Sequence, residues 1–295
     1  SSAASDVYKR QVMDKDCPAI EPIVEGIYKE RAEEEEDIFV TNEEALLLKD
    51  KSAMLIVVDV NLPAMTECPE LLKSVSTIVV LDHHRQNNET IKNAVVSYVE
   101  PYASSTCEMV AEILQYIVDK PKLKNIEADA MYSGILVDTD NFVIKAGVRT
   151  FEAAAFLRRA GADVTRVRKM FREDMEHCRI RTAIINKAEI YMDEFAISTF
   201  DGANVSGATV VGAKAANALL NIQGIRGSFV LTSLQDCIYI SARSIDELNV
   251  QVIMEKFNGG GHLTMAAAQL KDVTLEEAKQ QLEDVLQQMR EDGDI

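Results

Sequence analysis

Residues 77–85 read TIVVLDHHR, and this stretch decides how the rest of the chain is interpreted. The apolar run 78–81 leads directly into Asp82, His83 and His84. A short, continuous apolar run of this kind is typical of a buried strand in a parallel sheet. In open α/β sheets, ligands bind just beyond the carboxyl ends of the strands. A carboxylate followed by two imidazoles at such a position therefore indicates a metal site or a catalytic site.

The composition sets limits on the class of protein. Of the 295 residues, 47% are hydrophobic and 27% are charged, which is typical of a globular chain with one large domain or two ordinary ones. No stretch of 18 consecutive apolar residues and no secretory signal is present. The net charge of −17 argues against a partner as large as a long nucleic acid, which needs a basic face. A small anionic substrate remains compatible, provided that local cations offset the negative field.

The five cysteines point to a reducing compartment. They are scattered along the chain without a CxxC pair, at Cys17, Cys68, Cys107, Cys178 and Cys237. Such spacing favours reduced thiols in a cytosolic protein over disulfides or a structural zinc site.

Strand and helix patterns alternate through the first part of the chain. Strands are predicted at 37–40, 54–59, 77–81 and 94–100, and helices at 42–50, 69–74, 126–137, 149–160 and from 105 onward, where SSTCE has the spacing of a capping box. This alternation predicts an α/β domain with a parallel sheet and helices on both faces.

A second domain is predicted where the alternating strand and helix patterns give way to a long polar segment. Residues 174–192 are expected to form one long polar helix that connects the two parts, with the boundary near 176–195. Beyond it, strands are predicted at 196–200, 227–234 and 237–242, and helices at 212–221, 249–257 and 274–290.

Three clusters in the first domain carry chemistry. Asp59 ends the apolar run MLIVVD, His83 and His84 follow the run IVVL, and Asp138 and Asp140 follow YSGILV. An aspartate after an apolar run is commonly a turn or a helix cap. Taken together, however, the clusters favour a metal site at one sheet edge, and mixed carboxylate and imidazole ligands suit manganese, iron or zinc.

Two features of the second domain suit an anion. The run NGGGH contains Gly259, Gly260 and Gly261 followed by His262, and its glycines would expose backbone N–H groups to a phosphate, although a tight turn explains them equally well. Arg243, in the run SARS at a predicted strand end, offers a cation for the same anion, with a solvent-facing arginine as the alternative.

In combination, these stretches resemble the DHH phosphoesterase superfamily with a DHH-associated domain, and in particular the GdpP-type cyclic di-AMP phosphodiesterases. The resemblance rests on VVLDHHR, EPYASSTCEMVAEILQY (100–116), GILVDTDNF (134–142), RTFEAAAFLRRAGAD (149–163), SARS and NVQVIMEKFNGGGH (249–262). It implies an α/β, parallel-sheet DHH domain at 12–176, a helical linker at 177–194, and a smaller α/β substrate-binding domain at 195–295. Residues 1–11 fit neither pattern and are expected to be a non-native leader.

The resemblance also implies a role for each residue of the first site. Asp59 resembles the aspartate that bridges two metal ions, and His83 and Asp138 resemble ligands of the second ion. His84 is similar to the histidine that contacts the scissile phosphate, and Asp82 would orient an imidazole.

The resemblance assigns the second site and the reaction as well. Gly259–Gly261 and His262 resemble the loop that binds the substrate phosphate, with Arg243 nearby. The implied reaction opens cyclic di-AMP to linear pApA with two divalent ions, manganese first among them. The implied partners are a cyclic dinucleotide or a short oligonucleotide, with a homodimer as an open alternative. The catalytic region is expected in the cytoplasm, with membrane anchoring of a longer parent protein as a further alternative.

Two departures from the family pattern keep other functions open. The upstream motif GHxxPDxDA is missing, since the only histidines are His83, His84, His177 and His262. The chain is therefore expected to be truncated at its N-terminus. In addition, Val60-Asn61 stands where relatives often have Thr-His. The alternatives are a related enzyme that acts on nanoRNA or pAp, and an inactive nucleotide-binding fragment that holds about one ion.

Overall fold

The chain folds as two compact units, which are described separately. The computed structural model describes residues 10–13, 20–30, 38–50, 52–117, 122–245 and 248–295. The first unit ends at Arg172, and the second is Glu173–Ile295. Residues 1–9 of the expected leader lie outside the described residues, while Gln11 pairs with Phe39 in a short parallel bridge.

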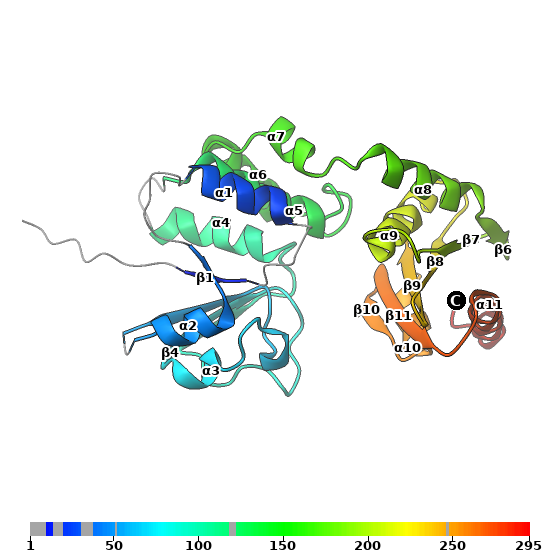
Figure 1. Ribbon diagram of the computed structural model, residues 1–295, viewed down its shortest axis with the longest axis horizontal. Helices are drawn as coiled ribbons and strands as arrows, with labels where there is room; N and C mark the ends of the chain where they lie inside the picture. The colour runs from blue at the N-terminus through cyan, green and yellow to red at the C-terminus, as the bar shows by residue number, and fades with distance from the viewer. Residues whose placement is uncertain (1–9, 14–19, 31–37, 51, 118–121, 246–247) are drawn as a thin grey trace, which may run out of the picture. The chain divides into compact units, whose positions relative to one another are not determined.

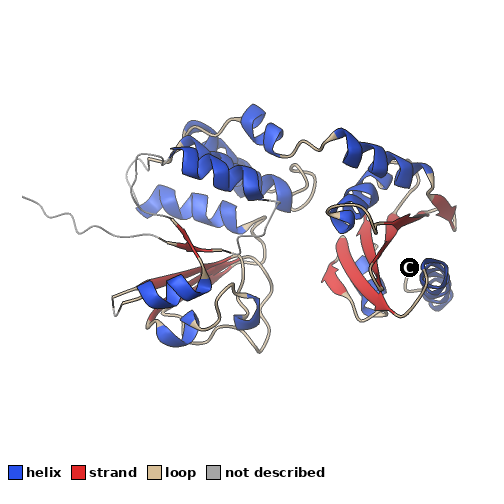
Figure 2. Ribbon diagram, viewed as in Figure 1, coloured by secondary structure: helices blue, strands red, loops and turns tan. Residues whose placement is uncertain are grey.

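The first unit combines a small sheet with a group of helices (Figures 1 and 2). Along the chain its elements are β1 (Gln11–Val12), α1 (Glu21–Glu30), β2 (Phe39–Val40), α2 (Asn42–Leu48), β3 (Met54–Val58), the 3-10 helix η2 (Pro63–Met65), α3 (Leu71–Ser74), β4 (Thr77–Asp82), β5 (Val96–Val99), α4 (Thr106–Ile117), α5 (Asn125–Asp138), α6 (Val148–Arg159) and α7 (Val164–Met170). Strands β3, β4 and β5 form a parallel sheet in that order, as the alternation of elements predicts.

The sheet of the first unit is buried on one face. Ile78 and Val80 of β4 are fully buried and pack with Val57, Leu72 and Ile91. On the opposite face, apolar side chains of the two outer strands are exposed: Met54, Ile56, Val58, Val96 and Tyr98. The run MLIVV, expected to be a buried strand, is thus buried on only one side in the described structure.

The helices α4, α5, α6 and α7 form their own core. Small residues such as Ala111, Ala128 and Ala153 allow the helix backbones to approach closely around Ile135 and Leu157. Helices α4 and α5 pack tightly at Gly134, where an added Cβ would overlap the sulfur of Cys107. This packing fixes the end of α5, and therefore Asp138, relative to the start of α4.

The second unit is a six-stranded sheet between helices. Its elements are α8 (Met175–Asn186), β6 (Glu189–Tyr191), β7 (Phe195–Asp201), α9 (Ala208–Leu219), β8 (Gly227–Leu234), β9 (Cys237–Ser244), α10 (Val250–Glu255), β10 (Gly260–His262), β11 (Met265–Lys271) and α11 (Leu275–Asp292). The strand order is β10-β11-β9-β8-β7-β6, and only β7 and β8 pair in parallel.

Both faces of this sheet are covered because its central strands carry apolar side chains on both sides. Phe229 and Leu231 of β8 face the core beneath α10 and α11, whereas Val230 faces the core beneath α8 and α9. Such two-sided burial requires consecutive apolar residues, which the sequence FVL in the middle of β8 supplies.

Two expectations about the second unit are wrong. The long helix expected over 174–192 ends at Asn186, and Glu189–Tyr191 pairs with β7 instead. Met192 and Asp193 both have positive φ (52° and 64°), which is the geometry of a tight hairpin between β6 and β7. The run NGGGH is likewise not wholly a loop, because Gly260–His262 forms the edge strand β10 against β11.

Candidate functional site

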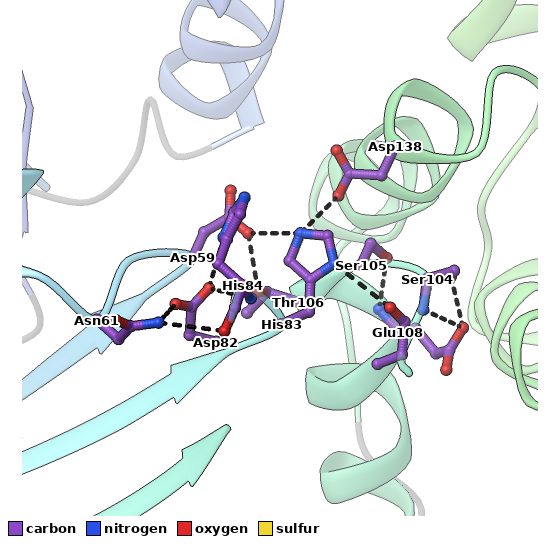
Figure 3. A network of polar contacts seen from close by, with 11 residues as sticks. Asp59, Asn61, Asp82, His83, His84, Ser104, Ser105, Thr106, Glu108 and Asp138 are labelled. Atoms are coloured by element: carbon purple, nitrogen blue, oxygen red, sulfur yellow. Dashed lines mark hydrogen bonds and ion pairs between the residues drawn. The ribbon is translucent and has the colours of Figure 1, made fainter. Parts of the chain in front are cut away.

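Three side chains of the first unit converge on one point (Figure 3). The Nε2 atom of His83 lies 3.6 Å from Asp59 Oδ1 and 3.8 Å from Asp138 Oδ2. Asp59 follows β3 and His83 follows β4, so neighbouring parallel strands deliver them to the same edge of the sheet. Asp138 comes from the last residue of α5 rather than from a strand. The structure thus brings together the three residues expected to bind metal.

Asp59 adopts a backbone conformation that few residues take. Its φ is 65°, in the left-handed region, which Asp enters more readily than most residues. Its backbone N–H still donates to the carbonyl of Leu81 at 2.9 Å, so the strand pairing continues up to this point. The turn directs the carboxylate toward α4, where Thr106 Oγ1 donates to Asp59 Oδ1 at 2.8 Å.

The ring of His83 is held in one orientation. The side chain is buried, and its Nδ1 lies 3.4 Å from the carbonyl oxygen of Ala103. Because a carbonyl can only accept a hydrogen bond, this contact places a proton on Nδ1. The other ring nitrogen, Nε2, points at the carboxylates of Asp59 and Asp138 (Figure 3).

This donor set fits a divalent cation. Two carboxylates that face the same imidazole nitrogen repel one another unless a positive charge lies among them. Asp59, His83 and His84 also offer ligand atoms that all lie within 4.8 Å of one another. Nitrogen and oxygen ligands of this kind suit manganese, iron or zinc. The carbonyl of Ala103 supplies the outer contact that metal-binding histidines usually make.

His84 belongs to a hydrogen-bonded chain beside the cluster. Its Nδ1 lies 2.8 Å from Asp82 Oδ1, and Asn61 Nδ2 donates to Asp82 Oδ2 at 2.5 Å. The hydrogen bond with Asp82 raises the pKa of His84, although partial burial opposes this. Burial would raise the pKa of Asp82, but its hydrogen bonds with His84 and Asn61 outweigh this effect and lower it. The pair therefore favours a carboxylate beside an imidazolium.

The other groups near the cluster respond to burial. Burial raises the pKa of Asp138, and the neighbouring Asp59 carboxylate raises it further, while His83 opposes the change. Burial, together with both carboxylates, raises the pKa of the Cys107 thiol to about 12. Cys107 is thus a protonated packing residue at neutral pH, which does not suit a metal ligand. The described cysteines are free thiols, at Cys68, Cys107, Cys178 and Cys237.

The residues expected to bind phosphate lie in the second unit. The sheet register sets Arg243 of β9 opposite Met265 of β11, and Met265 opposite His262 of β10. Directly opposed residues of antiparallel strands point to the same face, so Arg243 and His262 share one face of the sheet, two strands apart. Arg243 Nε donates to Asn217 Oδ1 of α9 at 2.7 Å, which orients the guanidinium.

The three glycines of NGGGH differ in their surroundings. A Cβ at Gly259 would overlap the carbonyl oxygen of Ala267, and a Cβ at Gly261, where φ is 148°, would overlap Met265. These two glycines are therefore required by the packing of β10 against β11. Gly260 is different, because nothing lies within 4 Å of a Cβ built there. Open space at Gly260 suits a ligand that approaches the backbone closely.

Several contacts of these sites escape sequence reasoning. Thr106 holds Asp59, Ala103 holds His83, and Asn217 holds Arg243. A partial signal exists for Thr106, since polar residues 104–106 stand between a predicted strand and a predicted helix. Asn217 lies inside an alanine-rich helix and gives no comparable signal.

Comparisons with known proteins agree on the family. Residues 3–135 match the model of the DHH family, N-terminal domain, and residues 197–291 match the DHHA1 domain. The chain is 46% identical over 244 residues to the cyclic-di-AMP phosphodiesterase PdeA of Listeria monocytogenes, covering 82% of this chain and 37% of that protein. It is 38% identical over 257 residues to the cyclic-di-AMP phosphodiesterase GdpP of Bacillus subtilis, covering 86% of this chain and 39% of that protein.

A solved structure shares the fold. An exopolyphosphatase-related protein from Bacteroides fragilis superposes with a TM-score of 0.71 at 19% identity, covering 89% of this chain and 76% of that one. The chain spans about two fifths of the length of these two cyclic-di-AMP phosphodiesterases. In the described part of the chain, no helix combines the length and apolar character needed to cross a bilayer.

Proposed function

Because this chain belongs to the DHH family and carries a DHHA1 domain, we propose that it is a metal-dependent phosphodiesterase that hydrolyses cyclic di-AMP to linear pApA. The observation that carries the proposal is the convergence of His83 Nε2 with the carboxylates of Asp59 and Asp138. The identity with the relatives named cyclic-di-AMP phosphodiesterases supports the choice of substrate.

Asp59, His83 and Asp138 would hold the divalent ion, with Mn²⁺ proposed first. When bound, the ion supplies an activated water and positive charge beside the phosphate oxygens. The ligands described here suit one ion, and a second ion, which the resemblance implies, would share Asp59. The number and identity of the ions are therefore part of the proposal.

The remaining residues of the first unit act on the phosphate itself. His84 carries a raised pKa through its contact with Asp82, so it is placed to donate a proton or a hydrogen bond to a phosphoryl oxygen. Negative charge on that oxygen grows in the transition state, and a preorganised donor stabilises it. Asp82 and Asn61 keep the imidazole in place, since the buried carboxylate of Asp82 contacts both.

The second unit carries the residues that we propose bind a phosphate of the substrate. Arg243 and His262 share a face of the sheet, and Gly260 leaves open space beside them. Arginine forms strong paired hydrogen bonds with phosphate oxygens. The Arg243 guanidinium would also offset the net charge of −17 locally, which an anionic substrate requires.

The test measures Mn²⁺-dependent conversion of cyclic di-AMP to pApA by the wild type and by His83→Ala. Chromatography separates and quantifies the substrate and the product. Loss of an outer contact to a metal ligand already costs about 10–100-fold, so removing the ligand itself is expected to lower kcat/KM by about 100-fold or more. His177→Gln is the matched control, because His177 lies in the second unit on α8 and should leave turnover unchanged. Undiminished turnover in His83→Ala would reject the ligand assignment.

The same assay separates the alternatives. A kcat/KM for pAp or short linear RNA that exceeds the value for cyclic di-AMP would favour the nanoRNA or pAp activity. Binding of cyclic di-AMP without turnover, at about one Mn²⁺ per chain, would favour an inactive nucleotide-binding region. A cytoplasmic location, a homodimer and membrane anchoring of a longer protein remain predictions.

A further inference from the structure

We propose that Glu108 is a positioning residue for the metal site, because it fixes the short loop 103–106 that holds two of the metal ligands. Glu108 lies on α4, and in the described part of the chain it forms no hydrogen bond or ion pair with Asp59, His83 or Asp138, so it would act only through this loop. The inference rests on the proposed function, since it concerns how the ligands of the proposed metal ion are held.

The loop touches both ligands that come from the sheet. The carbonyl of Ala103 orients His83 through Nδ1 at 3.4 Å, and the hydroxyl of Thr106 donates to Asp59 Oδ1 at 2.8 Å. Each contact reaches across a long separation in sequence, 20 residues for His83 and 47 for Asp59. A shift of the loop would therefore disturb both ligands at once.

Glu108 forms hydrogen bonds with residues of this loop (Figure 3). Glu108 is almost fully buried, at 1% exposure. Its Oε2 accepts hydrogen bonds from Ser104 N at 3.3 Å, Ser104 Oγ at 2.5 Å and Thr150 Oγ1 at 2.6 Å. Its backbone N–H donates to Ser105 Oγ at 3.0 Å. One residue thus joins the loop, α4 and the first turn of α6.

These contacts are more than the helix cap that the sequence predicts. In a capping box, the glutamate side chain returns to the backbone N–H of the cap residue, here Ser105. Glu108 instead reaches past Ser105 to both donors of Ser104 and across to Thr150. A simple helix start would need neither contact. Arg149 lies 3.9 Å from Oε1 and is paired with Glu112 at 2.7 Å.

Truncation of Glu108 should loosen the metal ligands. Without the carboxylate, the buried hydroxyls of Ser104 and Thr150 lose their shared acceptor, and an unsatisfied buried donor is unfavourable. The loop would rearrange to satisfy them, and the contacts from Ala103 and Thr106 would weaken. Outer contacts of metal ligands are typically worth 10–100-fold in metal affinity.

The experiment titrates the whole chain with Mn²⁺ alone and compares four variants with the wild type by calorimetry. Glu108→Ala is expected to weaken Mn²⁺ binding by about 10–100-fold. Glu108→Gln should recover part of the affinity, because its amide oxygen still accepts from the loop. Thr150→Val, a milder change, should give a smaller loss of Mn²⁺ affinity. If Glu108→Ala does not fold, the proposal is tested with Thr150→Val instead.

The matched control is Asp129→Ala. Asp129 is an equally buried carboxylate of the same unit, at 1% exposure, and it pairs with Arg166 at 2.6 Å on α7, away from the loop. Its loss should lower the thermal stability without changing the Mn²⁺ affinity of the folded protein. If Glu108→Ala behaves like Asp129→Ala, with wild-type Mn²⁺ affinity, Glu108 is only a structural residue and the proposal is overturned.

A second measurement does not depend on metal. Long-range ¹H–¹⁵N NMR of the histidine rings should show a proton on Nδ1 of His83 in the metal-free wild type, protected from exchange by the carbonyl of Ala103. Glu108→Ala should speed the exchange of this Nδ1–H with solvent, whereas Asp129→Ala should not. If the wild type binds no Mn²⁺, the metal proposal fails, yet this spectrum still decides the role of Glu108. An unchanged Nδ1–H signal in folded Glu108→Ala or Thr150→Val would overturn it.

Discussion

Three consecutive glycines have different roles: Gly259 and Gly261 allow β10 to pack against β11, whereas Gly260 borders open space. We expect Gly260→Ala to fold normally, since a Cβ there meets nothing within 4 Å, and to raise the KM for cyclic di-AMP because the methyl group would occupy space proposed for a phosphate. The free energy of unfolding should change by less than about 0.5 kcal/mol. Steady-state kinetics and thermal unfolding of the same sample check both statements.

Gly259→Ala is the control for that substitution. Its Cβ would overlap the carbonyl of Ala267, so this variant should lose stability wherever the substrate binds. A Gly260→Ala variant with unchanged KM would argue against a phosphate beside that residue.

Residues at the ends of apolar runs could be predicted from the sequence, and their partners could not. Asp59 and His83 stand out because each follows a strand pattern, and parallel strands bring such positions together. Thr106 and Asn217 do not stand out, because their roles depend on contacts across 47 and 26 residues of chain. Local sequence carries no information about those distances.

At the level of elements, the secondary-structure prediction is confirmed for several elements long enough to show a hydrophobic period or a capping pattern. The strands of the first sheet, the helices α4, α5 and α6, and the capped helix α11 all lie where periodicity and capping residues place them. No prediction covered α1, α7 or β11, and the prediction is wrong at two short strands, β6 and β10, which have three residues each. Three residues are too few to show a period, and their strand conformation comes from pairing with β7 and β11.

The start of α8 should respond to pH through His177. Its Nδ1 contacts the Asp174 carboxylate and its Nε2 lies 2.9 Å from the carbonyl oxygen of Ser206, so both ring nitrogens face acceptors and the imidazolium fits best. The contact with Ser206 and the hydrogen bond with Asp174 raise the pKa of His177. A raised pKa means that the stabilisation is present below the ordinary value near 6.5 and is lost as pH rises through the folded-state value.

The measurement is the urea midpoint of the second unit from about pH 5.5 to pH 9, for the wild type and His177→Gln. The urea midpoint of the wild type should exceed that of His177→Gln at the acid end. The difference between the two midpoints should become smaller toward the alkaline end. Parallel curves for the two proteins would show that the imidazolium contributes nothing to the fold.

For the whole molecule, two compact units with separate cores predict two steps of unfolding. All of the proposed metal ligands lie in the first unit, so Mn²⁺ should raise the midpoint of one step only. At a free concentration of 100 times Kd, the gain is about 2.7 kcal/mol. Differential scanning calorimetry with and without Mn²⁺ tests this. A single transition that moves as a whole would contradict it, and the shift should vanish in His83→Ala.

The left-handed backbone at Asp59 restricts how this site could be redesigned or could diverge. At a φ of 65°, glycine, asparagine and aspartate are accepted readily, whereas most other residues add about 1–2 kcal/mol of backbone strain. Glutamate or cysteine, the usual substitutes when a site changes its metal, would therefore be disfavoured at this position before any coordination is considered. A substitution at Asp138 would change the metal ligands without this backbone strain, because Asp138 ends a helix and does not have a positive φ.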